Sequence, residues 1–235
     1  MKNNKILHFL LVASILWALL PACRKDNFAG PDAQLYGEIL DAATGEAVGQ
    51  DIYNGSMIRY IERGYENPPV QEAYFKTDGT FRNNLMFSGT YDFFLNQGNF
   101  VPDTLRGVVL KKGENHLTFN VTQYILVYDV LIEQTGENTV TARFKLKQNT
   151  KDKVQKIGLF VHRESAVGNG TKYDSTERMI SGNVPSGYEM SLTWEYTGNV
   201  RGITKGKPYY FRVGALSNAP AAKYNYAPAV RLVLE

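Results

Sequence analysis

Three neighbouring residues near the C-terminus carry the chemistry of a weak glycan site. Tyr224, Asn225 and Tyr226 place two aromatic rings beside an amide. Aromatic faces stack on the apolar faces of sugar rings, and amide groups hydrogen-bond hydroxyls. We predict that the three residues bind glycan from the exposed tip of a loop spanning 217–228, although packing of the rings within that loop is an open alternative. The segment from Tyr65 to Tyr74 is the next candidate.

Side chains for catalysis and for metal binding are scarce. The chain has three histidines, of which His8 lies in the N-terminal apolar run, and its only cysteine is Cys23. This leaves His116 and His162 as nitrogen ligands, too few for a zinc site. No motif pairs a serine with a histidine or sets two carboxylates across a sugar. We therefore expect no catalytic residue, no cofactor and no metal, so the protein is predicted not to be an enzyme.

The residues before Cys23 predict a covalent modification of this cysteine. Residues 6–20 are almost wholly apolar; as a helix they would rise about 22 Å, short of the roughly 30 Å hydrocarbon core of a bilayer. The run ends at Leu20-Pro21-Ala22-Cys23, which resembles a bacterial lipobox. We predict a lipoprotein signal peptide over 1–22, lipid acylation of Cys23, and a tether over 23–30.

The anchor and the charge balance restrict the partners. Acylated Cys23 would bind the lipid of the outer membrane, and Asp26 partly matches a signal that sends Bacteroidetes lipoproteins to the cell exterior; the periplasmic face stays an alternative. Two of the 26 Lys and Arg residues precede Cys23, and the rest nearly balance the 23 Asp and Glu residues. Nucleic acid is not expected as a partner because phosphate binding needs a concentrated basic field.

The residues after the tether predict an all-β first domain over 31–122. Strand-forming residues dominate, with turn residues between them. The expected strands are 34–40, 57–62, 91–95 and 117–122. Thr44-Gly45 predicts a turn, and Asp78-Gly79 predicts a hairpin because this pair takes positive backbone angles readily.

Alternating apolar residues predict a second all-β domain over 123–235. The expected strands are 140–147, 157–161, 188–196 and 230–234, a spacing typical of an Ig-like sandwich. In such a fold the loops 148–153 and 217–228 emerge at one end. Trp194 shares a strand face with Met190 and Leu192, which favours a core position. We expect each domain to fold alone.

Several motifs carry family resemblances. Leu35-x-Gly37-x-Ile39-x-Asp41 and Gly89-Thr90-Tyr91 resemble the transthyretin-like, or carboxypeptidase regulatory-like, sandwich. The segment from Ile203 to Val213 resembles the fibronectin type III approach to strand F, which would make Tyr209 the corner tyrosine. Phe144 stands where such domains usually have an early-strand tryptophan.

Nearly the whole chain resembles the DUF3823 family of Bacteroidetes lipoproteins. That resemblance implies two tandem β-sandwiches and a non-catalytic accessory role beside a SusC/SusD-type uptake system for glycan or another nutrient, with weak binding of glycan or protein. A structural or adhesive, fimbrillin-like protein is the alternative. The C-terminal run 228–235 would complete its own domain, which favours a monomer.

Overall fold

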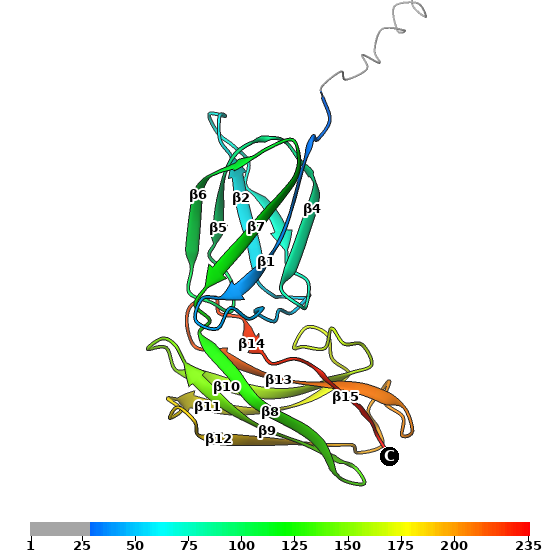
Figure 1. Cartoon of the computed structure of the whole chain (residues 1–235). Coiled ribbons are helices and arrows are strands. Elements are labelled where there is room, and N and C mark those ends of the chain that lie inside the picture. Colours follow the sequence, from blue (N-terminus) through cyan, green and yellow to red (C-terminus); the bar gives the residue numbers. More distant parts are fainter. Residues whose placement is uncertain (1–28) are drawn as a thin grey trace, which may run out of the picture. The chain divides into compact units, whose positions relative to one another are not determined.

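The computed structural model describes residues 29–235, in which all regular secondary structure is β-strand. The all-β prediction of two tandem sandwiches is therefore confirmed (Figure 1). The predicted signal peptide, Cys23 and most of the tether lie outside the described residues. No helix long and apolar enough to cross a membrane occurs in the part of the chain that the structure describes.

The first sandwich consists of two sheets. One has the order β4-β1-β7 and the other the order β3-β2-β5-β6. The strands of the first sheet are β1 (Ala33–Asp41), β4 (Thr80–Met86) and β7 (Gly113–Val121). Those of the second are β2 (Met57–Glu62), β3 (Gln71–Tyr74), β5 (Gly89–Leu95) and β6 (Asp103–Leu110). Strands β1 and β7 pair in parallel, and every other pair in this sandwich is antiparallel.

Aromatic rings fill the space between these two sheets. Side chains alternate along β1 between buried and half-buried positions because successive residues of a strand point to opposite faces. Phe81 and Phe119 lie 5.4 Å apart between ring centroids, and Phe93 lies 6.0 Å from Phe119. The first sandwich thus has its own apolar core.

Asp78-Gly79 forms the predicted hairpin turn, in which the Lys76 amide donates to the Thr80 carbonyl at 2.7 Å and the Gly79 amide donates to the Lys76 carbonyl at 2.9 Å. Gly79 has a φ of 83°, and the Asp78 carboxylate accepts a hydrogen bond from the Thr80 amide at 3.0 Å. The flanking strands do not pair with each other: β3 pairs with β2, and β4 pairs with β1 in the opposite sheet. The hairpin therefore does not extend beyond its turn, because turn chemistry fixes a change of direction, whereas the partner of each strand is decided by distant segments.

The second sandwich has sheets of order β12-β9-β8 and β11-β10-β13-β14, with β15 also paired to β13. The first of these sheets comprises β8 (Ile125–Gly136), β9 (Thr139–Gln148) and β12 (Glu189–Glu195). The other comprises β10 (Val154–His162), β11 (Asp174–Gly182), β13 (Pro208–Ser217), β14 (Tyr224–Tyr226) and β15 (Val230–Val233).

The predicted core residues of the second sandwich are buried. Trp194 and Phe144 are inaccessible to solvent, and the Trp194 ring lies edge-on to Phe211 at 5.5 Å. Tyr209 makes the predicted corner: its hydroxyl accepts from the Thr204 amide at 2.7 Å and donates toward the Gly202 carbonyl at 3.3 Å. This core is separate from that of the first sandwich.

Candidate functional site

Tyr224, Asn225 and Tyr226 do not lie at an exposed loop tip. They form strand β14, in which all three residues are buried. The loops 148–153 and 217–228 do meet at one end, since the Asn218 amide donates to the Lys153 carbonyl at 2.9 Å. However, the first sandwich contacts β14 at this end, and the prediction of an exposed binding tip was therefore wrong.

Asn225 connects the two sandwiches through its side-chain amide. Its Nδ2 donates to the Asn99 carbonyl at 2.7 Å and to Gln123 Oε1 at 3.1 Å, while its Oδ1 accepts from the Ile125 amide at 3.2 Å. The side chain is fully buried. Because buried polar groups are costly unless they are hydrogen-bonded, these contacts fix the position of β14 against the first sandwich.

Asn99 provides the reciprocal contacts from the first sandwich. Its Nδ2 donates to the carbonyls of Gly49 and Tyr224, at 2.9 and 3.1 Å. Its Oδ1 accepts from Gln50 Nε2 at 3.1 Å and from Ser56 Oγ at 3.3 Å. Asn99 and Asn225 therefore form the centre of a buried polar network, which we call the junction network.

The rings of Tyr224 and Tyr226 point to the other face of β14. Both pack edge-on to Phe160, with centroid separations of 5.3 and 6.0 Å. Their hydroxyls donate to Glu177 Oε1 at 2.9 Å and to Asp51 Oδ2 at 3.0 Å. Burial and the adjacent carboxylates raise the pKa of both tyrosines far above the ordinary range, so both remain neutral hydrogen-bond donors.

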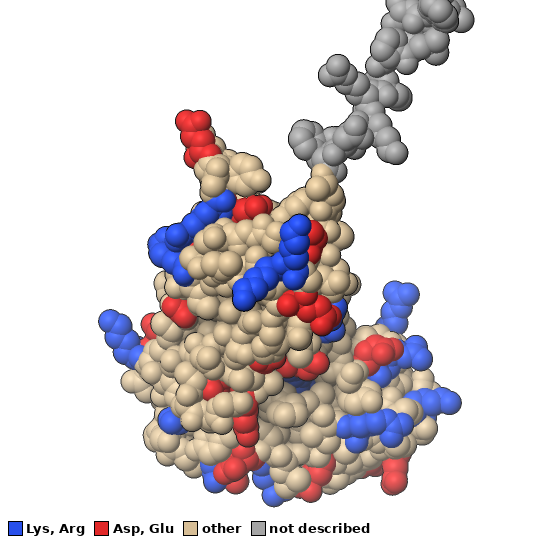
Figure 2. All heavy atoms as spheres, turned by 45° about the horizontal axis from the view of Figure 1, so that its top comes forward, with Lys and Arg blue, Asp and Glu red and all other residues tan. Residues whose placement is uncertain are grey.

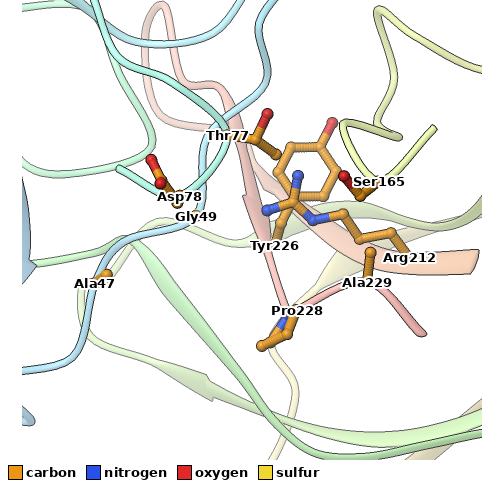
Figure 3. Close-up of a pocket in the computed structure, with 9 residues that line it drawn as sticks. All are labelled: Ala47, Gly49, Thr77, Asp78, Ser165, Arg212, Tyr226, Pro228 and Ala229. Atoms are coloured by element: carbon orange, nitrogen blue, oxygen red, sulfur yellow. The ribbon is translucent and has the colours of Figure 1, made fainter. Parts of the chain in front are cut away.

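Arg212 hydrogen-bonds to three chain segments at the junction between the two sandwiches. Its Nε donates to the Ala227 carbonyl at 2.8 Å, and its Nη1 donates to the carbonyls of Gln50 and Val167 at 2.9 and 3.2 Å. The guanidinium lies over the Tyr226 ring, 4.4 Å from its centroid (Figure 3). Burial lowers the pKa of Arg212 to about 10, which leaves the group charged at neutral pH.

An open groove lies beside this buried network. A cavity of about 370 Å³ is lined by Ile52, Tyr53, Asn54, Gly55, Met57, Tyr74 and Lys223. Tyr53 is 62 % exposed and Tyr74 is 59 % exposed, so both rings are accessible to a ligand. Asn54 and Lys223 add polar groups that can hydrogen-bond hydroxyls.

A second cavity of about 260 Å³ continues the groove. It shares Asn54 and Lys223 with the first cavity and is also lined by Asp51, Lys156, Asn169, Leu216, Ala222, Tyr224 and Tyr226. We call the two cavities together the junction groove. The predicted residues Tyr224 and Tyr226 thus reach a candidate site only as buried wall residues, whereas the exposed aromatic residues come from the first sandwich.

A tight turn positions Tyr53. The Asp51 carboxylate accepts a hydrogen bond from the Tyr53 amide at 3.1 Å, and Asn54 has a φ of 58°. Asparagine tolerates this left-handed conformation better than most residues do. The dipeptide Asn54-Gly55 is a recognisable turn signal, and with the adjacent tyrosine it could have directed attention to this segment.

Tyr74 is positioned by an exposed ion pair. Its hydroxyl donates to Glu72 Oε2 at 3.1 Å, and Glu72 Oε1 accepts from Arg59 Nε at 3.0 Å. The hydrogen bond to Glu72 raises the pKa of Tyr74. Tyr74 belongs to the segment that the sequence indicated as the next candidate, and the structure places it in the groove; Tyr65, at the other end of that segment, does not line the groove.

The remaining titratable residues have local roles. His116 Nε2 lies 3.0 Å from Glu38 Oε2, and His162 Nδ1 accepts from the Glu164 amide at 3.1 Å. Asp41 caps the turn after β1 by accepting from the amides of Ala43 and Thr44. Within residues 29–235 no group of three or more His, Cys, Asp or Glu side chains is placed to hold a metal ion.

Charges of both signs are mixed on the surface. Figure 2 shows acidic and basic side chains interspersed over the face that it presents. Exposed ion pairs also occur, among them Arg143 with Glu133 and Lys145 with Asp129. This face therefore offers no broad basic field of the kind that phosphate backbones require.

Family models match both sandwiches. The model described as "Protein of unknown function (DUF3823) N-terminal domain" matches residues 33–122, and "Domain of unknown function (DUF3823_C)" matches residues 125–231. Among curated proteins, none matches the chain.

Solved structures with the same architecture come from Bacteroides uniformis and Parabacteroides merdae. A Bacteroides uniformis protein whose name proposes carbohydrate binding is 35% identical, with a TM-score of 0.80 over 87% of this chain and 100% of its own. A DUF3823 family protein from Parabacteroides merdae is 22% identical, with a TM-score of 0.72 over 87% of this chain and 100% of its own. The latter likeness concerns the fold alone.

Proposed function

This chain belongs to the DUF3823 family, and from that premise we propose that it is a non-catalytic protein that binds glycan in the junction groove. The name of the Bacteroides uniformis relative supports the choice of carbohydrate as the ligand class. The groove itself supplies the chemistry, because it combines accessible aromatic faces with amide and ammonium donors.

The observation that carries the proposal is the pair of exposed tyrosines in one cavity. Tyr53 and Tyr74 are each more than half exposed and line the same space as Asn54 and Lys223. An aromatic side chain that is exposed to water gains free energy when a ligand covers its ring, so exposed aromatic residues often mark binding sites. Hydrogen bonds hold both residues in place: the Tyr53 amide donates to Asp51, and the Tyr74 hydroxyl donates to Glu72. This ordering reduces the conformational entropy lost on binding.

We expect the affinity to be modest. Few aromatic platforms and a flexible polymer, whose ordering opposes binding, are consistent with dissociation constants of about micromolar to millimolar. Such values suit a protein that holds a polysaccharide near an uptake system rather than one that sequesters it. We further propose that the protein is an accessory of a SusC/SusD-type transporter, a role that its resemblance to the DUF3823 lipoproteins implies.

Binding to a glycan array, followed by calorimetric titration of the best glycan, tests this function. Tyr53→Ala and Tyr74→Ala should each weaken binding by about tenfold, the loss of one stacking contact of roughly 1–1.5 kcal/mol. The matched controls are Tyr65→Ala and Tyr188→Ala, which remove tyrosines that are 64 % and 58 % exposed but do not line the groove.

Two results would contradict the proposal. Equal affinities of the groove variants and the two controls would place the glycan elsewhere. If the wild-type chain binds no glycan on the array, a scaffold role beside the transporter becomes the better explanation.

The proposed location on the outer membrane, facing the exterior, rests on Cys23. The apolar run that ends at Leu20-Pro21-Ala22-Cys23 supports acylation at that residue. Cys23→Ser should move the protein from the membrane fraction to the soluble fraction and abolish incorporation of labelled fatty acid. Protease treatment of intact cells then distinguishes the exterior face from the periplasmic face.

A further inference from the structure

The junction contains one more cavity, which has a different chemistry. About 390 Å³ of space is lined by Ala47, Gly49, Thr77, Asp78, Ser165, Arg212, Tyr226, Pro228 and Ala229. Residues of the first sandwich form one wall and residues of the second form the other (Figure 3). Tyr53 and Tyr74 take no part in it, so this cavity is distinct from the stacking end of the junction groove.

Arg212 has unused hydrogen-bonding capacity at this cavity. A guanidinium has five N–H donors. Three hydrogen bonds, one from Nε and two from Nη1, connect it to the carbonyls of Ala227, Gln50 and Val167. Both donors of Nη2 are without a hydrogen-bond partner among the described residues. The residue is only 3 % exposed, which leaves the cavity as the route by which a ligand can reach Nη2.

Gly49 keeps this nitrogen accessible. A Cβ atom at position 49 would lie 2.5 Å from Arg212 Nη2. Any larger residue would therefore push against the guanidinium. In Figure 3 the Arg212 side chain extends across the Tyr226 ring toward Gly49 and the Asp78 side of the cavity.

The charge of Arg212 is not neutralised by an ion pair within residues 29–235. Buried charges are normally paired. The Asp51 carboxylate favours the charged form of Arg212 from a distance but forms no ion pair with it, and accepts instead from Tyr226 and Gly170; Asp78 accepts from Thr80. In Figure 3 the Asp78 oxygens point away from Arg212.

We propose that this cavity binds the carboxylate of a small hydroxylated acid, with a uronic acid as the class of ligand that fits best. The carboxylate would accept hydrogen bonds from Arg212 Nη2 and supply a counter-charge in direct contact with the guanidinium. Ser165 and Thr77 offer hydroxyls to the sugar, and Pro228 and Ala229 offer apolar surface. This inference does not depend on glycan binding in the junction groove.

The proposal is tested with the full-length chain made soluble by Cys23→Ser. This protein is titrated with glucuronate, with glucose and with acetate. Glucuronate should bind saturably and at least tenfold more tightly than glucose, which lacks the carboxylate, and than acetate, which lacks the hydroxyls. Raising the salt concentration should weaken glucuronate binding because the contact is ionic. Similar affinities for glucuronate and glucose, or no saturable binding of glucuronate, would overturn the proposal. Acetate as tight as glucuronate would overturn the assignment to a sugar acid.

Two variants locate the site. Arg212→Lys keeps the charge but loses the planar fork, and should reduce glucuronate affinity at least tenfold. Because Arg212 also holds the junction together, Ala229→Glu provides an independent test: it introduces a carboxylate at the cavity wall and should abolish glucuronate binding while the protein stays folded. Undiminished glucuronate binding in folded Ala229→Glu would contradict the assignment.

The two proposed sites can be tested independently of each other. Tyr74→Ala should leave glucuronate binding unchanged, and Ala229→Glu should leave binding of a neutral glycan in the junction groove unchanged. Loss of both activities in either variant would mean that the cavities form one site, which would contradict a separate carboxylate site.

Discussion

The core of each sandwich and the junction between them are both buried, but they differ in what fills them. The cores consist of aliphatic and aromatic side chains. The junction contains Asn99, Asn225 and Arg212, which hydrogen-bond across the two sandwiches, while Arg212 Nη2 and Gln50 Oε1 have no partner among the described residues. Apolar burial is non-directional, whereas hydrogen bonds require particular distances and angles. The cores therefore supply stability, and the junction supplies a defined alignment.

That alignment matters for both proposed sites. The junction groove takes Tyr53 and Tyr74 from the first sandwich and Lys223 from the second. The Arg212 cavity likewise needs walls from both. A fully paired polar network rigidifies a buried region, while a partly paired one is costly. Breaking single members of the network should thus affect binding as well as stability.

The largest expected effect is in a core. Phe144→Ala removes a fully buried ring from the second sandwich and should lower the free energy of unfolding by about 3–5 kcal/mol. Urea denaturation measures this change. Because the substitution does not touch the junction, the glycan affinity per folded molecule should be retained. A decrease in the free energy of unfolding of less than about 1 kcal/mol would mean that the core repacks around the gap.

A smaller loss of stability is expected at the junction. Asn225→Ala removes the Asn225 partner of the Ile125 amide and of Gln123 Oε1, whereas the Asn99 carbonyl still accepts from the Tyr124 amide at 3.1 Å. We expect destabilisation of about 2–3 kcal/mol, since unsatisfied buried groups cost about 1–3 kcal/mol each and partial relaxation offsets some of this. Weaker binding in the junction groove should accompany it.

Asn120→Ala is the matched control for this variant. Asn120 is an exposed residue on β7, and its removal should change stability by no more than about 0.5 kcal/mol. If Asn225→Ala behaves like Asn120→Ala in urea denaturation, the junction network does not stabilise the protein.

The smallest effect is expected at an ion pair outside both regions, and it depends on pH. Arg63 Nη2 lies 2.7 Å from Asp92 Oδ1, and its hydrogen bond lowers the pKa of that carboxyl, helped by the Gly107 amide. A lowered folded-state pKa means that the ion pair contributes stability above the ordinary value of 3.8, and that this contribution is lost as pH falls through the folded-state pKa. Thermal unfolding between pH 7 and pH 3 should therefore show a falling midpoint.

Asp92→Asn should make that fall shallower. Asp103→Asn, at an exposed position on β6, serves as the control and should keep the wild-type slope. Identical slopes for Asp92→Asn and wild type would assign the acid sensitivity to other carboxyls.

The sequence by itself determined many of the strands, the turn at Asp78-Gly79 and many residues of the two cores, but not strand β14, whose residues were expected in a loop. Alternation of side chains is a local property, so Trp194 and Phe144 could be placed without a partner being known, and the resemblance of Ile203 to Val213 to a fibronectin type III motif placed Tyr209. Family membership and the all-β class could likewise be predicted from motifs along the chain.

Only the tertiary structure decided which polar and aromatic residues face solvent. The segment Tyr224-Asn225-Tyr226 has the composition of an exposed loop, yet it is buried because Asn99 and Asp51, more than 100 positions away, pair with it. Tyr53 and Tyr74 instead stay exposed beside it. The physical reason is that hydrogen-bond partners of buried polar groups come from segments distant in sequence, and no local pattern records which segments will meet.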